Sequence, residues 1–250
     1  MIVEIVTIGD ELLLGETIDV NAVWLARELG AIGIPVVRRT TVGDGAAAIT
    51  SAVREALDRT GALITTGGLG PTADDRTRPA IAALFGRELR EDASIWEGLR
   101  AIWRDRGRPG EPPEANRVQA LVPDGAVVLH NRHGTAPGLF LEDEDGRWVA
   151  MLPGVPREMR GLMHDELLPR LRARTEDDRR VIRSVTLRTT GIAESSLPDL
   201  LGEYAEGFAS VTLAYLPGQE GVDLRLTVRD ARPGDADQVL ATAADALRSR

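Results

Sequence analysis

The feature of this sequence that most constrains its fold is a regular alternation of short β-rich runs with helical patterns. The predicted strands cover residues 2–8, 34–42, 62–66, 126–130, 138–142 and 148–152, and the predicted helices cover 19–29, 46–58, 92–105 and 155–173. Strands that alternate with helices are typical of a parallel sheet, because each parallel connection has to cross the sheet. We therefore expect a parallel α/β domain, with Asp19 as a helix N-cap, Gly30 as a helix stop and a kink at Pro169.

A second, smaller domain is predicted after residues 174–180, a charge run of sequence RTEDDRR that we interpret as a linker. The pattern that follows is β-α-β-β-α, with elements at residues 181–190, 195–201, 210–216, 222–228 and 235–247. A chain of 250 residues is long enough for one large domain or two small ones. We therefore expect domains at residues 1–174 and 180–250, the second of them small and of the α+β class.

Two residue types are missing, and their absence excludes several reaction classes. All 30 residues in the lysine-plus-arginine count are arginine, and the cysteine count is zero. The chain therefore cannot use a disulfide, a thiol nucleophile, thiolate zinc ligands, Schiff-base chemistry or the phosphate-binding lysine of a P-loop. Because arginine stays protonated and only three histidines remain, acid–base chemistry falls mainly on carboxylates.

The net charge of −9 argues against nonspecific binding to nucleic acid or to an anionic membrane, because both need a positive surface. No apolar run approaches the roughly 20 residues of a membrane span. The first residues, MIVEIVTIGDE, also lack the basic start of a signal peptide. We therefore expect a cytoplasmic protein with neither nucleic acid nor membrane as a partner.

Four segments rich in glycine or proline follow predicted strands, and each carries a carboxylate. They are Gly9-Asp10-Glu11, Gly43-Asp44-Gly45, the segment from Gly67 to Asp75, and the segment from Pro153 through Gly154 to Glu158. In an open parallel sheet, ligands bind beyond the carboxyl ends of the strands. We therefore predict a binding site at this edge of the sheet. For Asp44 a simple turn and a ligand-binding role are equally good interpretations.

The segment from Gly67 to Asp75 has the sequence GGLGPTADD, which combines exposed backbone N–H groups with two acids. The predicted binding residues are Gly67, Gly68, Gly70, Pro71 and Thr72, and the acids are Asp74 and Asp75. Bare carboxylates repel a phosphate, so we expect a divalent metal to bridge these acids to a phosphate or diphosphate. Glu11 is a candidate second metal ligand. The alternative is that one of the two aspartates, or the Asp10–Glu11 pair, caps a helix.

A fifth segment, from Asn131 to Gly138, connects two predicted strands. Gly134 and Thr135 are the candidates for binding phosphate in it. His133 and Arg132 could also contact a ligand, although loop histidines and surface arginines are more commonly only solvated.

Together these segments resemble the CinA family of competence/damage-inducible proteins. The segments that carry the resemblance are IGDELLLGE (residues 8–16), TVGD (41–44), GGLGPTADD (67–75), GTAPG (134–138) and LPGVPREM (152–159). Residues 189–197 (TTGIAESSL), 214–217 (AYLP) and 222–227 (VDLRLT) are similar to the middle, KH-like region of the family. The resemblance therefore runs over essentially the whole chain.

The resemblance implies a three-layer, doubly wound α/β domain like that of the molybdopterin-binding MoaB- and MoeA-type proteins, followed by a KH-like domain. It implies hydrolysis of ADP-ribose to AMP and ribose 5-phosphate with a divalent metal (magnesium, cobalt or manganese), potassium as an optional helper, and a homodimer. It also implies that GGLGPTADD binds nucleotide or pterin phosphates. Asp75 corresponds to an acid of metal-dependent chemistry, and Glu11 to the acid of the GDE motif.

The chain departs from the family in two places. Many relatives continue into a deamidase domain, whereas this sequence stops at Arg250, so we do not carry that activity over. A glutamate usually follows the two aspartates, where this chain has Arg78-Pro79. The loss of that carboxylate would weaken catalysis if the acid positions metal or water.

Two functions from different classes follow. The first is a hydrolase in which Asp75 and Glu11 hold the metal, Asp74 or Asp10 orients the attacking water, and Gly9, Pro153, Gly154 and Glu158 complete the substrate site. The alternative is a non-catalytic nucleotide- or pterin-binding module, which Pro79 favours. Nucleic-acid binding is disfavoured, because the segment that would be the GxxG loop, Gly191 to Glu194, ends in an acid.

Overall fold

The structure, a computed structural model, describes residues 1–175, 180–218 and 220–250. The chain forms two compact units, one of Met1–Ala26 with Val36–Arg174 and the other of Arg27–Pro35 with Thr175–Arg250. Of the predicted linker at residues 174–180, positions 176–179 lie outside the described residues. Each unit is described by itself below.

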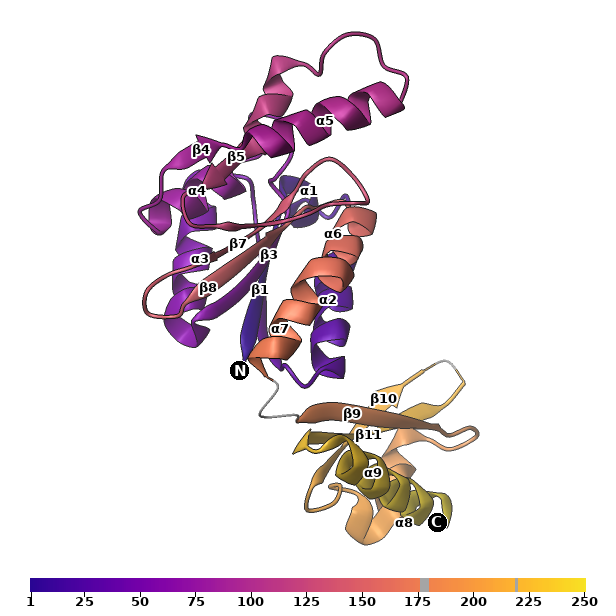
Figure 1. Cartoon of the computed structure of the whole chain (residues 1–250). Coiled ribbons are helices and arrows are strands. Elements are labelled where there is room, and N and C mark those ends of the chain that lie inside the picture. Colours follow the sequence, from indigo (N-terminus) through magenta and orange to yellow (C-terminus); the bar gives the residue numbers. More distant parts are fainter. Residues whose placement is uncertain (176–179, 219) are drawn as a thin grey trace. The chain divides into compact units, whose positions relative to one another are not determined.

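A six-stranded sheet forms the centre of the first unit (Figure 1). Its order is β2 (Val36–Val42), β1 (Val3–Ile8), β3 (Ala62–Thr66), β8 (Trp148–Leu152), β7 (Gly138–Glu142) and β6 (Val127–Leu129). The first four strands are parallel to one another, and β7 and β6 are antiparallel to their neighbours. Every residue of β1, β3 and β8 is buried, as expected for strands covered on both faces. The prediction of a mostly parallel α/β sheet is confirmed.

Helices cover both faces of this sheet and make three layers (Figure 1). In the figure, α3 (Ala46–Thr60) and α4 (Thr77–Leu84) lie on one side, and α6 (Pro156–Leu162), α7 (Leu168–Arg174) and the start of α2 (Val20–Ala31) lie on the other. The apolar faces of α3 and α4 pack with side chains of β1, β3, β7 and β8 in one hydrophobic core. This burial of apolar surface is the main source of stability for the layer.

Of the three helix signals read from the sequence, the cap at Asp19 is confirmed, the stop at Gly30 is wrong, and the kink at Pro169 stays a prediction. The side chain of Asp19 accepts a hydrogen bond from the Ala22 amide at 2.9 Å, so it caps α2. The expected stop at Gly30 is wrong, because α2 continues through Ala31 and the left-handed glycine is Gly33, with φ 80°. A π-helical turn, η2 (Met163–Leu167), separates α6 from α7 immediately before Pro169, which has no N–H for the helical ladder.

A smaller layer lies above the sheet edge in Figure 1 and contains α5 (Ala93–Asp105), η1 (Glu114–Ala120) and the antiparallel pair β4 (Leu89–Glu91) and β5 (Leu121–Pro123). The carboxylate of Asp92 caps α5 by accepting hydrogen bonds from the amides of Ser94 and Ile95. Of the apolar side chains at helical spacing along α5, Leu99 is buried, whereas Ile95, Ile102 and Trp103 are half-buried, because this helix lies away from the main core.

The second unit is a three-stranded antiparallel sheet of order β10-β11-β9 with one long helix. Its elements are β9 (Val181–Arg188), η3 (Glu194–Ser196), α8 (Leu197–Leu201), η4 (Gly202–Tyr204), β10 (Val211–Pro217), β11 (Val222–Ala231) and α9 (Pro233–Arg248). Alternate residues of β11 are buried, and they pack with the apolar face of α9. The observed order matches the predicted β-α-β-β-α pattern.

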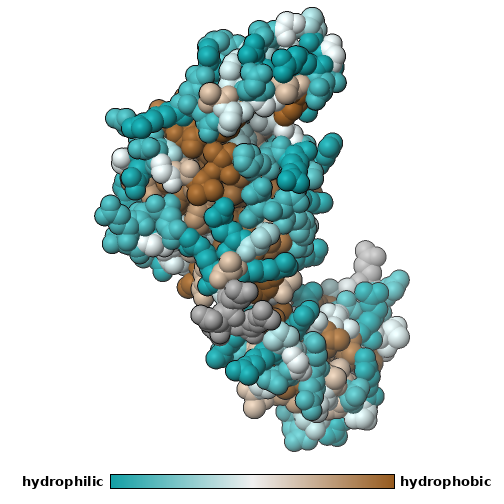
Figure 2. Space-filling view, in the orientation of Figure 1, coloured by the Kyte–Doolittle hydropathy of each residue, from teal (hydrophilic) through white to brown (hydrophobic). Residues whose placement is uncertain are grey.

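The surface in view is mostly hydrophilic, with apolar side chains in limited areas (Figure 2). Within the described residues, no helix combines the length and the apolar character that crossing a membrane would require.

Candidate functional site

The four acid-bearing segments lie at one edge of the sheet. Because β1, β2, β3 and β8 are parallel, their carboxyl ends point the same way. These ends lead into the segments that begin at Gly9, Gly43, Gly67 and Pro153. Strand β7 runs the opposite way, so the connection from β6 to β7, which contains Gly134 and Thr135, joins the same edge. The structure thus brings together all five segments from which the site residues were predicted.

Asp10 and Asp44 bind each other's backbone. The Asp10 amide donates to Asp44 Oδ2 at 3.0 Å, and the Asp44 amide donates to Asp10 Oδ1 at 3.2 Å. A Cβ on Gly43 would lie 2.2 Å from Asp10 Oδ1, so only glycine fits at this position. The exchange locks the short helix α1 (Asp10–Leu13) to the loop after β2. Asp44 therefore has a structural role, and each carboxylate keeps one oxygen outside this exchange.

The glycine-rich loop is folded around the carboxylate of Asp75. Asp75 Oδ1 accepts from the Gly70 amide at 2.7 Å, and Oδ2 accepts from the amide and the hydroxyl of Thr72 at 2.8 and 2.6 Å. The Gly67 amide donates to the carbonyl of Leu152 at 3.0 Å. Three of the donors predicted for phosphate are therefore engaged within the protein. Among the described residues the amide of Gly68 has no such partner.

The start of α4 anchors the first two glycines of this loop. The hydroxyl of Thr77 donates to the Gly67 carbonyl at 2.9 Å, and the Thr77 amide donates to the Gly68 carbonyl at 3.2 Å. Gly67 and Gly68 have φ values of 111° and 65°, which favour glycine. A Cβ on Gly68 would also lie 2.1 Å from the Thr77 hydroxyl oxygen. The double glycine is therefore required by the packing of the loop on α4.

Asp74 stands apart from its neighbour because it is exposed. The nearby Thr72 hydroxyl, the backbone amide of Asp74 and the charge of Arg76 together hold the pKa of the Asp74 carboxyl below its ordinary value. The carboxylate is consequently ionised throughout the physiological range. Of the two adjacent aspartates, Asp75 holds the loop together and Asp74 faces solvent.

Arg78 lies beneath the loop and was noted from the sequence only as a departure from the family pattern. Its side chain is buried, with Nη1 donating to the Val118 carbonyl at 2.7 Å and Nη2 to the Leu69 carbonyl at 3.2 Å. Burial lowers the pKa of Arg78 to about 10, and the nearby Asp75 opposes that shift. Arg78 is thus charged at neutral pH and links the glycine-rich loop to η1.

The connection between β6 and β7 is fixed by Glu158. Asn131 Nδ2 donates to Glu158 Oε2 at 2.6 Å and to the Ala136 carbonyl at 2.8 Å. The Glu158 carboxyl group covers Gly134 so closely that a Cβ there would lie 2.0 Å from its carbon. His133 Nε2 lies 2.9 Å from Asp165 Oδ2, so this histidine is hydrogen-bonded to a side chain of η2.

Asn21 is a buried polar residue that the sequence did not reveal. Its Nδ2 donates to the Gly154 carbonyl at 2.7 Å and to the hydroxyl oxygen of Thr66 at 3.2 Å. These bonds tie the start of α2 to the ends of β3 and β8. The only signal available beforehand was a polar residue in the first turn of a predicted helix, beside its N-cap.

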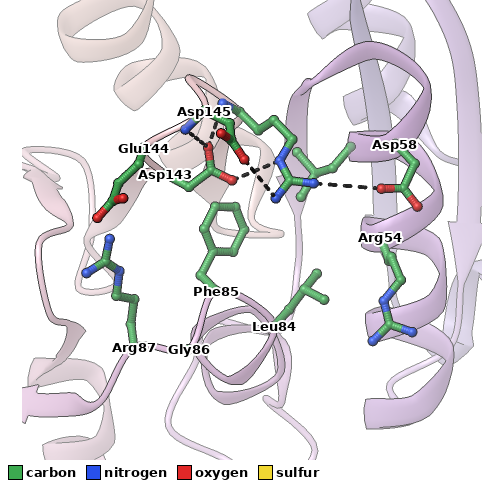
Figure 3. A pocket seen from close by; sticks show the side chains of 11 residues that line it. Arg54, Asp58, Leu84, Phe85, Gly86, Arg87, Asp143, Glu144 and Asp145 are labelled. Carbon is green, nitrogen blue, oxygen red and sulfur yellow. Dashed lines mark hydrogen bonds and ion pairs between the residues drawn. The ribbon is translucent and has the colours of Figure 1, made fainter.

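A cavity of about 420 Å³ lies away from this edge, and Figure 3 shows the side chains that line it. It is formed by the end of α3, the end of α4 and the turn between β7 and β8, next to the amino ends of β3 and β8. Arg147, within its wall, makes ion pairs of 2.8, 3.8 and 3.9 Å with Asp143, Asp58 and Asp145. Because Asp58, Asp143 and Asp145 form ion pairs with Arg147, they are not available to a ligand, and this cavity is not our candidate site.

The acids of the carboxyl edge do not form a closed metal site. Over residues 1–175, 180–218 and 220–250, no three acidic or histidine side chains come close enough together to hold an ion. Magnesium, however, is commonly bound by one or two carboxylates together with substrate phosphates. Asp75 Oδ1 accepts a single hydrogen bond and so retains a lone pair for such an ion. The donor set therefore suits a metal that arrives with a phosphorylated substrate.

Comparison with known proteins agrees with this fold. Residues 4–173 match the probable molybdopterin binding domain, and residues 184–250 match the damage-inducible protein CinA KH domain. A CinA-like protein of Gemmatimonas aurantiaca is 59% identical over 100% of this chain and 58% of its own length. A CinA-like protein of Deinococcus deserti is 40% identical over 99% of this chain and 60% of its own length. The chain thus spans less than two thirds of these relatives.

Among solved structures, the protein CinA with unknown function from Thermoplasma acidophilum is 33% identical, with a TM-score of 0.60. The match covers 67% of this chain and 96% of that chain. Sequence and structure therefore agree on the same family. The chain belongs to the CinA family, with a probable molybdopterin-binding domain followed by the KH domain of that family.

Proposed function

We propose that this chain hydrolyses ADP-ribose to AMP and ribose 5-phosphate with the help of a divalent metal ion. The observation that carries the proposal is the carboxyl edge, where a glycine-rich loop with an unpartnered amide at Gly68 lies beside the ionised carboxylate of Asp74. A diphosphate needs backbone donors and a cation, and the site offers both donors and carboxylates that can hold one. Membership of the CinA family supports the same assignment.

The binding of the diphosphate falls to two segments. The glycine-rich loop, held in shape by Asp75 and Thr77, offers the Gly68 amide, which has no hydrogen-bond partner among the described residues. The connection through Gly134 and Thr135, held by Glu158, lies at the same edge of the sheet. Because both segments are fixed by internal hydrogen bonds, they need little reorganisation when charge develops on the phosphoryl group.

The metal would be held by Asp75 and Glu11 together with oxygens of the diphosphate. When bound, it neutralises phosphate charge during the transfer. Asp75 has a lone pair available on Oδ1, and Glu11 lies in the first turn of α1, directly after Asp10. Arg78 supports this arrangement from below by fixing the Leu69 carbonyl.

The attacking water is assigned to Asp74. An ionised, exposed carboxylate can orient a water and take one of its protons, while the water oxygen bonds to phosphorus and the ribose 5-phosphate leaves. Asp10 is the weaker candidate, because one of its oxygens already binds the Asp44 amide. In this scheme the low pKa of Asp74 keeps it in the basic form at working pH.

The test uses the full chain, ADP-ribose and a panel of magnesium, manganese and cobalt, with and without potassium, and follows AMP by chromatography. We expect metal-dependent AMP that is lost in Asp74→Asn and retained in Asp105→Asn, a matched change at an exposed aspartate outside the edge. Absence of AMP with every metal would refute the hydrolase.

One observation favours a second candidate, a nucleotide- or pterin-binding protein without hydrolysis. Pro79 lies in the first turn of α4 and is exposed, in the Arg78-Pro79 segment where the family resemblance implies a glutamate. Proline is tolerated there because the first amides of a helix lack partners. Calorimetric binding of ADP-ribose without turnover in the assay above would support this candidate over the hydrolase.

A further inference from the structure

The connection between β6 and β7 is held along one face of α6 and the π-helical turn η2. Three residues of that face contact it, and their spacing in the sequence is three and then four positions: Glu158, Gly161 and Asp165. Residues three or four positions apart lie on the same side of a helix. The helix therefore supports the connection at three successive points, two of which fall on His133.

The imidazole ring of His133 packs against the helix at Gly161. A Cβ on Gly161 would lie 1.9 Å from His133 Cδ2 and 2.4 Å from Nε2, so only glycine leaves room for the ring in this position. From there Nε2 reaches Asp165 Oδ2 at 2.9 Å. Because a carboxylate oxygen only accepts, Nε2 carries the proton and donates it to this bond.

The backbone of His133 is fixed as well as its ring. The His133 amide donates to Asn131 Oδ1 at 2.8 Å, and Asn131 Nδ2 in turn donates to Glu158 Oε2 at 2.6 Å. His133 is thus held at its amide through Asn131 and at its ring by Asp165. The next peptide group, which carries the amide of Gly134, therefore has little freedom to turn.

The two amides that follow His133 are free to bind a phosphate. Within residues 1–175, 180–218 and 220–250, the amides of Gly134 and Thr135 donate to no other backbone group. The segment that leads into α6 also packs on the glycine-rich loop, since the Gly67 amide donates to the Leu152 carbonyl at 3.0 Å. The chain from β8 into α6 therefore supports both segments to which we assign the diphosphate.

We propose that His133 and Asp165 are positioning residues for the hydrolysis. Their hydrogen bond holds the amides of Gly134 and Thr135 in the orientation in which they stabilise the charge on the phosphoryl group. Donors that are already oriented stabilise a transition state well, because they need not turn as the charge develops. His133 acts through the two amides and does not itself touch the substrate. This inference rests on the proposed function.

The experiment measures kcat and KM for AMP formation by the full chain with the metal that gives the highest turnover. His133→Ala and Asp165→Ala each remove one end of the bond, and each should lower kcat about tenfold while KM changes by less than about twofold. The double variant should lose no more than either single variant, because both changes break the same bond. His133→Gln, whose amide nitrogen can take the place of Nε2, should recover most of the lost kcat.

Asp165 protects the test against misfolding, because its side chain is exposed and Asp165→Ala should leave the fold intact. Glu166→Ala, which removes the neighbouring acid of the same turn, is the matched control and should keep the wild-type kcat. A wild-type kcat in both His133→Ala and Asp165→Ala, or losses that add up in the double variant, would overturn the positioning role alone. Absence of AMP from wild type with every metal would overturn the proposed function and this inference with it.

Discussion

Replacing Asp75 by alanine should destabilise the first unit, because this carboxylate holds the glycine-rich loop together. Three hydrogen bonds are lost, one from the Gly70 amide and two from the amide and hydroxyl of Thr72. The substitution also removes the negative charge that favours the charged form of the buried Arg78. Asp74→Ala is the matched control, since the Asp74 side chain is exposed and the hydrogen bonds to Gly70 and Thr72 are made by Asp75.

The size of the effect follows from the three bonds. A hydrogen bond to a charged group contributes about 1.5–3 kcal/mol. Thr72 is exposed, so its two donors return to water in the variant, and the loss at the half-buried Gly70 counts most. We therefore expect Asp75→Ala to lower the free energy of unfolding by about 2–4 kcal/mol. With a urea dependence of about 2 kcal/mol per molar, the midpoint should fall by about 1–2 M.

Urea unfolding followed by tryptophan fluorescence measures this shift for the correct unit. All four tryptophans, at positions 24, 96, 103 and 148, belong to the first unit, so the signal does not report on the second. Asp74→Ala should unfold close to the wild-type midpoint. A midpoint for Asp75→Ala that coincides with wild type would refute the idea that this carboxylate organises the loop.

Three further predictions concern the same edge. Arg78→Met should lower the free energy of unfolding by about 2–4 kcal/mol in the same urea assay, because the buried Leu69 carbonyl and the partly buried Val118 carbonyl lose their donors; an unchanged midpoint would contradict this. Gly134→Ala should lose about 1–3 kcal/mol, because its Cβ would collide with Glu158, whereas Gly98→Ala, inside α5, meets nothing within 4 Å and should be neutral or slightly stabilising. Because the pKa of Asp74 lies below the ordinary value of 3.8, its carboxyl group is ionised above pH 3.8 and becomes protonated only at lower pH. AMP formation by the wild type should therefore not fall through protonation of this group between pH 8 and pH 5, and a loss of wild-type activity with a midpoint near pH 6 would contradict a base of lowered pKa at this position.

The sequence alone was enough for the six strands of the central sheet and for the edge at which the candidate segments meet, but not for α1, α4 or the β4–β5 pair. Strand β3, at Ala62–Thr66, and strand β8, at Trp148–Leu152, have the predicted bounds, because continuous apolar runs between glycines have only one way to be buried. The cap at Asp19 is local chemistry and was equally readable. The stop at Gly30 failed because a glycine can remain inside a helix when packing continues past it.

Only the tertiary structure shows which candidate residues hold the loops in shape and which are exposed to solvent. Asp74 and Asp75 are adjacent and of the same type, yet one faces solvent and the other binds two loop residues, a difference set by how the chain turns back toward Gly70. The pairing of Asp10 with Asp44 spans 34 positions and depends on the parallel register of β1 and β2. Such contacts have no signature in the local sequence.

What the sequence determined by itself was the pattern of apolar runs, the glycines between them and a set of available chemistries restricted to carboxylates, arginine and backbone. These properties depend only on composition and on residues close together in the chain, so they can be read from the sequence. What only the tertiary structure decided was which groups are buried without partners, as at Asn21 Oδ1, and which carboxylates are already engaged. The physical reason is that burial and hydrogen-bond satisfaction depend on residues far apart in the chain, and only the folded sheet edge brings them within reach of one another.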